Sequence, residues 1–229
     1  MSVRVLTATA MLVVGAACHA RPPDHAWPTT ASCIDTTGAW WTVLQQWGAS
    51  ESLHQWRNDS LRTVLRAMAD TDQVVRNAWI AKQQDSALAR RMHVVDSVND
   101  VRIRAILASD GWPTRTLVGA RGESAAWLIV QHGDDSLQHM GLRLLAQAAD
   151  SEVNPTEVAM LEDRVRMHDH RPQRFGSQLS ERTDGKLELY VLDDPEHVEE
   201  RRARVGLPPL KEYECQIEAT YHRRVVSAY

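Results

Sequence analysis

The chain has 229 residues, a formal net charge of −4 at pH 7, and the charged and hydrophobic fractions of a globular protein. Its length suits one domain of ordinary size or two small ones. It has no block of lysines and arginines, which excludes nucleic acid as the main partner, because phosphate binding needs clustered basic side chains.

The start of the chain has the pattern of an export signal. Arg4 precedes an apolar run over residues 5–17, which is too short for the ~20 residues of a membrane-spanning helix. The run leads into Cys18 through small residues, as in a bacterial lipobox. We expect a signal peptide over residues 1–17, lipidation at Cys18, and an exported, membrane-anchored lipoprotein in the periplasm or on the cell surface. Cleavage after Ala20, giving a secreted protein, and an uncleaved anchor are the alternatives.

The segment 18–57 follows as a tether that is rich in proline and tryptophan. Its tryptophans form either a surface for a partner or glycan, or an apolar stripe that packs on the domain. If Cys18 is lipidated, Cys33 and Cys215 remain. An even number of cysteines in an exported protein predicts a disulfide between them. Two unpaired thiols are the alternative.

The first strong helical pattern begins near Asn58, in a run of residue types that cap helices. Apolar residues then recur at helical spacing to Trp79. Asp72 and Arg76 interrupt this apolar stripe four positions apart, where they can pair with each other. Because buried charge is costly unless paired, the two residues form either a structural ion pair or a holder that keeps Arg76 ready for an anion.

A second helix is predicted over residues 86–109. Asn99 and Arg102 interrupt its apolar face, with Asp96 close by. Two successive helices with polar residues on their apolar faces predict a shared buried polar cluster, since local rules are broken at functional or strained sites. Residues 114–122, with two glycines, are predicted to form a loop.

The stretch that follows is the predicted centre of the domain. Residues 124–130 carry no charge, and a helix that is apolar all round belongs in the interior. It ends in the polar residues Gln131, His132 and, after a glycine, Asp134. A buried helix that delivers an imidazole and a carboxylate at its end suits the floor of a site.

The last third of the chain changes character. A helix is predicted after Asp134, and another after Asn154-Pro155. Two alternating runs, 173–179 and 186–192, flank an Asp-Gly turn and predict a β-hairpin. A short helix and a helical tail, 213–229, complete the chain. The predicted fold is mainly α: a globular domain over residues 58–212 with one small antiparallel β-hairpin near residues 173–192.

With these residues in view, the chain resembles a bacterial family known only as a domain of unknown function, family 6624, over roughly residues 60–212. The resemblance rests on motifs in a fixed order: Asp72-Gln73-x-x-Arg76, Asp96-x-x-Asn99-x-x-Arg102, Gly111-Trp112-Pro113-Thr114, Gln131-His132, Leu161-Glu162-Asp163-Arg164, Pro172-Gln173 through Ser177-Gln178, and Gly206-Leu207-Pro208-Pro209-Leu210. The family carries no established activity and implies no mechanism. It implies that the polar residues on the apolar faces belong to a recurring pattern.

These residues define a candidate site. His132 and Asp163 are the candidate catalytic residues, with His132 as general acid or base. The candidate ligand-binding residues share side chains that hold anions or form hydrogen bonds: Arg76, Asn99, Arg102, Trp112, Gln131, Arg164, Gln173 and Gln178.

Three functions remain open from the sequence. The first is a non-catalytic envelope protein whose polar cluster binds a small ligand or an envelope protein partner. The second is a hydrolase or lyase on a small polar or anionic substrate. The third is a metal carrier that uses His132, Asp134, His168 and His170, although no zinc spacing is present. No cofactor is expected, because the chain has no phosphate loop and no dinucleotide fingerprint.

Overall fold

The computed structural model of the protein describes residues 5–6, 29–35, 42, 56–82, 85–227 and 229. The predictions for Cys18, for cleavage of the signal peptide, and for most of the tether and its tryptophans fall outside these residues. The α-helices of the described part are α2 (Asp59–Ala81), α3 (Ser86–Asp110), α4 (Arg115–His132), α5 (Asp135–Leu145), α6 (Pro155–His168), α7 (Val198–Arg204) and α8 (Leu210–Tyr221). The fold is mainly α, as predicted.

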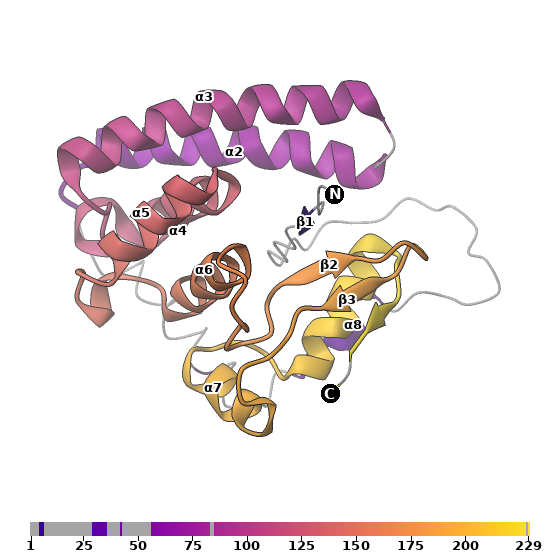
Figure 1. Ribbon diagram of the computed structural model, residues 1–229. Helices are drawn as coiled ribbons and strands as arrows, with labels where there is room; N and C mark the ends of the chain where they lie inside the picture. Colours follow the sequence, from indigo (N-terminus) through magenta and orange to yellow (C-terminus); the bar gives the residue numbers. More distant parts are fainter. Residues whose placement is uncertain (1–4, 7–28, 36–41, 43–55, 83–84, 228) are drawn as a thin grey trace.

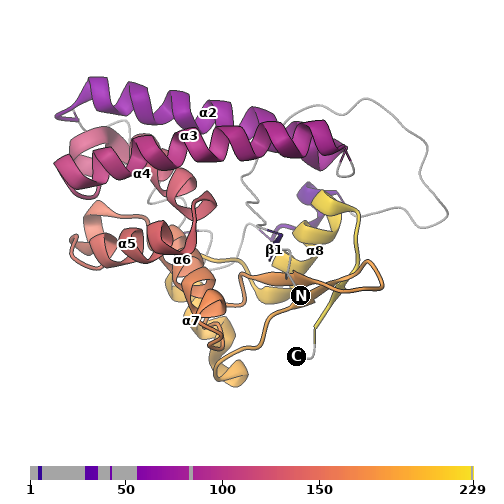
Figure 2. The ribbon, with the colours of Figure 1, turned by 45° about the horizontal axis from the view of Figure 1, so that its top comes forward.

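The long helices α2 and α3 form an outer layer that covers α4 (Figures 1 and 2). A side chain caps the start of each helix. The Asn58 side chain accepts a hydrogen bond from the backbone amide of Leu61, and the Asp85 side chain accepts hydrogen bonds from the amides of Ala87 and Leu88. These caps fix where the helices start, and the apolar spacing turns one face of each toward α4.

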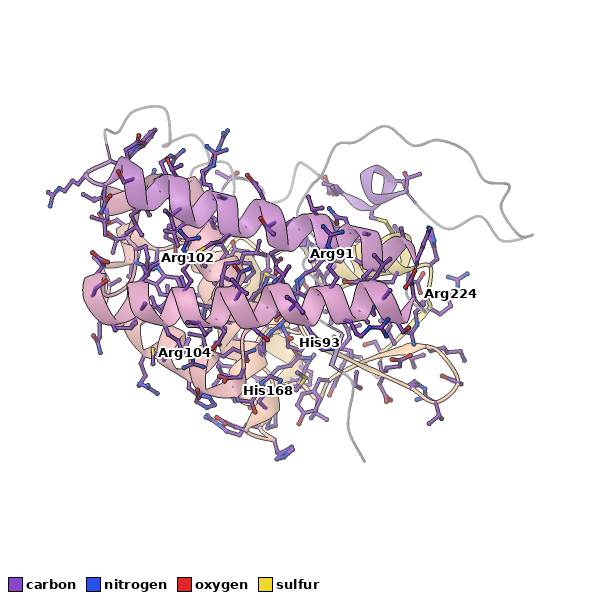
Figure 3. The ribbon with its side chains drawn as sticks, turned by 90° about the horizontal axis from the view of Figure 1, so that it is seen from above. Arg91, His93, Arg102, Arg104, His168 and Arg224 are labelled. Atoms are coloured by element: carbon purple, nitrogen blue, oxygen red, sulfur yellow. A yellow bond between two sulfur atoms is a disulfide. The ribbon has the colours of Figure 1, made fainter. Side chains whose placement is uncertain are left out.

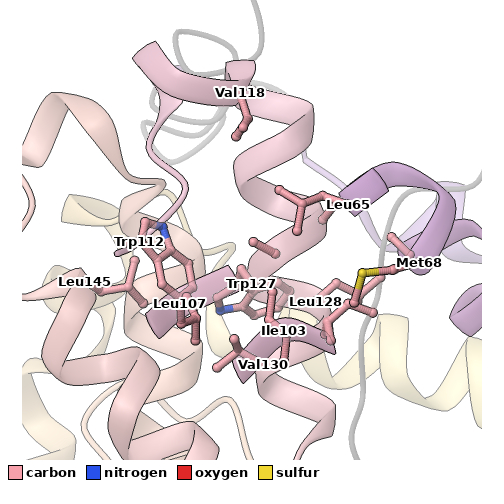
Figure 4. Packing of buried hydrophobic residues seen from close by; sticks show 14 of the residues in the cluster. Leu65, Met68, Ile103, Leu107, Trp112, Val118, Trp127, Leu128, Val130 and Leu145 are labelled. Atoms are coloured by element: carbon pink, nitrogen blue, oxygen red, sulfur yellow. The ribbon is translucent and has the colours of Figure 1, made fainter. Parts of the chain in front are cut away.

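Helix α4 is the centre of the domain, as its sequence predicts. Every residue from 125 to 131 is buried. Around it pack Leu65 from α2, Ile103 from α3 and Leu137 from α5, all fully buried (Figure 4). A helix with no exposed face requires such cover on all sides.

The prediction of a loop over residues 114–122 is wrong, because α4 already begins at Arg115. The two glycines serve packing rather than a loop. Gly119 has φ +73° and ψ 163°, which kinks α4, and a Cβ at this position would meet the guanidinium of Arg62. Arg62 Nη1 donates to the carbonyl of Val118 at 2.8 Å. The kink therefore lets α2 approach α4 closely.

The β-hairpin is present but shorter than predicted. Strands β2 (Leu179–Glu181) and β3 (Leu187–Leu189) pair antiparallel, and Gly185 in the turn has φ +84°. The small mixed sheet has the order β1-β2-β3-β4, where β1 is Val5–Leu6 and β4 is Val225–Val226. β4 runs parallel to β3, so the end of the chain after α8 returns to the sheet.

A second, smaller core joins the sheet to the C-terminal helix. Tyr213, Ile217 and Tyr221 of α8 are buried against leucines of β2 and β3. The 3-10 helix η1 (Thr30–Cys33) lies against α8, and Cys33 forms a disulfide with Cys215. Two further 3-10 helices, η3 (Asp150–Glu152) and η4 (Pro195–His197), precede α6 and α7. The disulfide between Cys33 and Cys215 joins η1 to α8.

Candidate functional site

The two charges that interrupt the apolar face of α2 meet in the interior. Asp72 is fully buried, and Arg76 Nε lies 3.1 Å from both of its carboxylate oxygens. Gln73 donates a further hydrogen bond to Asp72 Oδ2 at 2.9 Å. Because each partner compensates the other, this pair can be buried at an acceptable cost.

His132, the last residue of α4, completes this pair. Its side chain is 2% exposed, and its Nδ1 lies 2.8 Å from Arg76 Nε and 3.0 Å from Asp72 Oδ1. When Arg76 donates to Nδ1, the ring proton resides on Nε2, and Nδ1 is an acceptor. In that tautomer His132 accepts a hydrogen bond from a guanidinium, which disfavours a second proton on the ring.

Burial and the charge of Arg76 lower the pKa of His132 to about 4, against the opposing pull of Asp72. Burial alone would raise the pKa of Asp72, but its contacts with His132, Arg76 and Gln73 hold it below its usual value. At pH 7 the imidazole is therefore neutral and the carboxylate ionised.

Helix α3 closes the other side of Arg76. The Nη2 atom of Arg76 lies 2.6 Å from Asp96 Oδ1, and the Nη1 atom of Arg76 lies 3.4 Å from the sulfur of Met92. Burial raises the pKa of Asp96, although Arg76 opposes the shift. Arg76 thus joins α2, α3 and α4 through one guanidinium, and two carboxylates balance its charge.

Arg164 of α6 lies near this cluster and has no such balance. It is 2% exposed, and its Nη1 donates to the carbonyl of Gln131 at 2.7 Å. Its Nε has no hydrogen-bond partner, and no carboxylate among the described residues lies within ion-pair distance of it. Burial lowers the pKa of Arg164 to about 10, and its charge contributes to the low pKa of His132. Within the described part of the chain, the guanidinium is a buried cation without an acidic partner.

Asp163, next to Arg164 in sequence, faces elsewhere. Its carboxylate accepts the backbone amides of Arg174, Phe175 and Ser177 and the hydroxyl of Ser177, at 2.6–3.1 Å. These bonds fold residues 174–177 over α6, which is why the first alternating run, predicted to be a strand, forms a loop. Asp163 makes no hydrogen bond to His132.

Gln173 and Gln178 belong to the same loop. Gln173 donates to the carbonyls of Gln178 and Tyr190, and its own oxygen accepts the amide of Gln178 at 2.8 Å. Gln178 donates to the hydroxyl of Ser177. These amides close the loop on the hairpin and do not reach His132.

Trp112 contacts a buried pair of carboxyl groups, Glu123 and Glu157, that the sequence analysis does not predict. Its indole donates to Glu123 Oε1 at 3.0 Å, and Glu123 lies beside Glu157 of α6. Burial and the neighbouring carboxyl raise the pKa of Glu123 well above its usual range, and burial raises that of Glu157 to about 7. One proton shared between them at neutral pH fits these shifts. The available signal was a glutamate directly before the apolar run of α4.

Asn99 and Arg102 of α3 do not join the His132 cluster. They line a groove of about 270 Å³ between α2 and α3. The predicted single polar cluster is therefore two: one below the α2–α3 layer around Arg76, and one in the groove between the two helices.

The four residues considered for a metal are dispersed. His132 pairs with Asp72, and Asp134 caps α5 and binds Arg104 at 2.6 Å. His168 faces Asp135 at 2.9 Å, and His170 is exposed in the turn after α6. Within the described part of the chain, no group of three or more histidine, cysteine or acidic side chains is arranged to hold a metal ion.

The fold and the site define a mainly helical domain with a buried cluster of arginine, aspartate and histidine side chains. The profile of a family of unknown function, DUF6624, matches residues 59–226, and the chain belongs to this family. No curated protein matches the chain, and no solved structure does. Among the described helices, none is long and apolar enough to cross a membrane.

Proposed function

We propose that this domain binds a small anion, such as a carboxylate or a phosphate, beside Arg164, His132 and Arg76. The observation that carries the proposal is Arg164, which is buried and, among the residues that the structure describes, has no acidic partner and no hydrogen bond at Nε. Burying a lone charge is costly unless a counter-charge accompanies it. An anion next to this guanidinium removes the cost.

The surrounding charges favour Arg164 over Arg76 as the main contact. Asp72 and Asp96 already hold Arg76 at 3.1 and 2.6 Å. His132 is neutral at pH 7, and in the tautomer with the proton on Nε2 its ring is a hydrogen-bond donor. Donors around a buried guanidinium suit an acceptor ligand rather than a cation.

The same geometry does not favour the hydrolase or lyase. A general base works best when its pKa lies near the operating pH, and the pKa of His132 is about 4. Asp163, the other candidate catalytic residue, makes its hydrogen bonds to the 174–177 loop. We therefore propose binding rather than catalysis at this cluster.

Thermal unfolding of the mature chain with acetate, succinate, citrate, phosphate and sulfate tests the proposal, with sodium chloride at matched ionic strength. A ligand at a hundred times its Kd raises the midpoint by roughly 5–10 °C in a domain of this size. Arg164→Met is expected to abolish the shift. Arg104→Met, at an exposed ion pair, is the control and keeps it. No shift with any of these anions, or a shift that Arg164→Met retains in full, would overturn the proposal.

We further propose that the domain is exported and lipid-anchored at Cys18. The disulfide between Cys33 and Cys215 supports an oxidising compartment, since such bonds are rare in the cytosol. Expression of the full chain with labelled palmitate tests this: label in the membrane fraction, lost in Cys18→Ser, is expected. Unlabelled protein in the cytosol contradicts export, and unlabelled protein in the medium contradicts the anchor alone.

A further inference from the structure

The groove between α2 and α3 lies on the outer layer of the molecule, away from Arg164. Its volume is about 270 Å³. Figure 3 looks down on this layer and shows Arg102 between the two helices. The apolar wall comes from α3, through Val94, Val95 and Val98, and Met68 of α2 faces it. Val94 and Val98 are 63% and 62% exposed, unusually high values for large apolar side chains that are adjacent on one helix face.

Two polar side chains in this groove have no hydrogen-bond or ion-pair partner among the described residues. Asn99 is 6% exposed, its Nδ2 is buried without a hydrogen bond, and no hydrogen bond to its Oδ1 is present among the described residues. Since both ends of the amide are unbonded, it can turn to present either end to the groove at little cost. A buried amide without partners destabilises the fold, and a ligand in the groove that hydrogen-bonds to it would remove that cost.

Arg102 stands at the rim of the same groove. It is exposed and forms no ion pair or hydrogen bond within the described part of the chain. Arg104, two positions later, is held instead by Asp100 and Asp134 at 2.8 and 2.6 Å. The groove thus offers a free guanidinium and an amide donor at one end of an apolar wall.

We propose that this groove binds an aliphatic monocarboxylate, independently of the anion proposed beside Arg164. The carboxylate contacts Arg102 and the Asn99 amide, and the chain covers Val94 and Val98.

The charges on this face favour such a ligand over a second copy of the chain. Arg91 and Arg102 both lie along it, as Figure 3 shows. A two-fold contact places the same patch on both subunits, so these like charges would be brought together. A carboxylate instead neutralises the arginine that it contacts.

Titration calorimetry of the mature chain with octanoate, octanol and acetate tests the head group and the tail separately. Octanoate is expected to bind, and loss of either the charged contact or the apolar tail weakens binding about tenfold or more, as a contact worth about 1.4 kcal/mol does. Absence of octanoate binding overturns the proposal. Equal affinity for octanol and octanoate also overturns it, because the arginine then has no role.

Matched variants place the site. Arg102→Gln is expected to weaken octanoate binding about tenfold, while Arg91→Gln, an exposed arginine on the same helix, leaves it unchanged. Asn99→Leu is expected to unfold at a higher temperature than the parent and yet to lose octanoate. Arg164→Met keeps octanoate binding, which separates this site from the anion site. An equal loss of octanoate affinity in Arg102→Gln and Arg91→Gln overturns the proposal. It is also overturned if sedimentation shows a dimer that Val98→Asp dissociates.

Discussion

Arg76 Nε lies 2.8 Å from His132 Nδ1, although 56 positions separate the two residues in the chain. Both side chains also contact Asp72, at 3.1 and 3.0 Å. The three residues form one buried unit that joins α2 to the end of α4. Its stability and its titration follow from this shared carboxylate.

Removal of Arg76 leaves the Asp72 carboxylate buried without its guanidinium. Arg76→Met is therefore expected to lower the free energy of unfolding by about 3–5 kcal/mol. Arg104→Met, which breaks two ion pairs that are more exposed, with Asp100 and Asp134, should cost about 1 kcal/mol or less for each pair. Urea denaturation at pH 7 measures both. A cost for Arg76→Met no greater than for Arg104→Met would show that the buried pair adds no stability.

Acid should weaken the fold through His132. Its pKa is about 4 in the folded chain and near 6.5 when unfolded, so below pH 6.5 the unfolded state takes up the proton first. This contribution is present above pH 6.5 and is lost as the pH falls toward 4, by at most roughly 3 kcal/mol. His132→Gln removes the dependence. The unfolding free energies of parent and variant at pH 7.5 and 4.5 measure it, and parallel losses in both chains would contradict it.

The pair of Glu123 and Glu157 should act in the opposite direction. The pKa of Glu157 is about 7 in the folded chain, above its usual value, so the folded state holds the extra proton. Stability from this group is present below pH 4.5 and is lost as the pH rises through 7. Glu157→Gln, which keeps the shape without the charge, is expected to be more stable than the parent at pH 8 by roughly 2 kcal/mol. Equal stability of the two chains at pH 8 would argue against a shared proton.

A close helix crossing depends on Gly141 of α5. A Cβ at this position would overlap Val130 of α4 and approach Trp112 and Leu161. Gly141→Ala is expected to destabilise the fold by about 1–3 kcal/mol despite the better helix propensity of alanine. Adding Val130→Ala should restore part of the loss, which a double-mutant cycle in urea reveals. If the effects of the two substitutions simply add, the cost of Gly141→Ala does not arise from its contact with Val130.

The disulfide closes a long loop, since 182 positions separate Cys33 from Cys215. Replacing both with serine is expected to lower the free energy of unfolding by up to roughly 5 kcal/mol, chiefly by freeing the unfolded chain. Calorimetry of the parent with and without reductant, beside the double serine variant, measures this. A reductant effect that persists in the variant would show that another reaction is responsible.

The helices could be predicted because their signals are local. Asn58, Asp134 and Asn154 cap α2, α5 and α6, and each cap lies within three residues of the amide it accepts. The glycines of α4 misled the prediction, because Gly119 was interpreted as a loop signal. Its kink depends on Arg62 of another helix, and no local pattern carries that information.

The site could be predicted only in part, for the same reason. The interruption of the apolar face by Asp72 and Arg76 is visible in the sequence, and so is His132 at the end of a buried helix. Which groups meet is decided by packing: Arg76 reaches His132, while Asn99 and Arg102 turn to the groove. Glu123 and Glu157 escaped notice because each is a single glutamate until α4 and α6 pack together.

The two buried titrations have slopes of opposite sign over overlapping ranges. Between about pH 4.5 and 6.5, the stability that His132 loses on acidification is offset by the stability that the glutamate pair gains. The contributions of these two groups to the free energy of unfolding therefore partly cancel under mildly acidic conditions. Removal of His132 alone is expected to make the fold more tolerant of acid. Removal of the glutamate pair alone is expected to make it more tolerant of alkali.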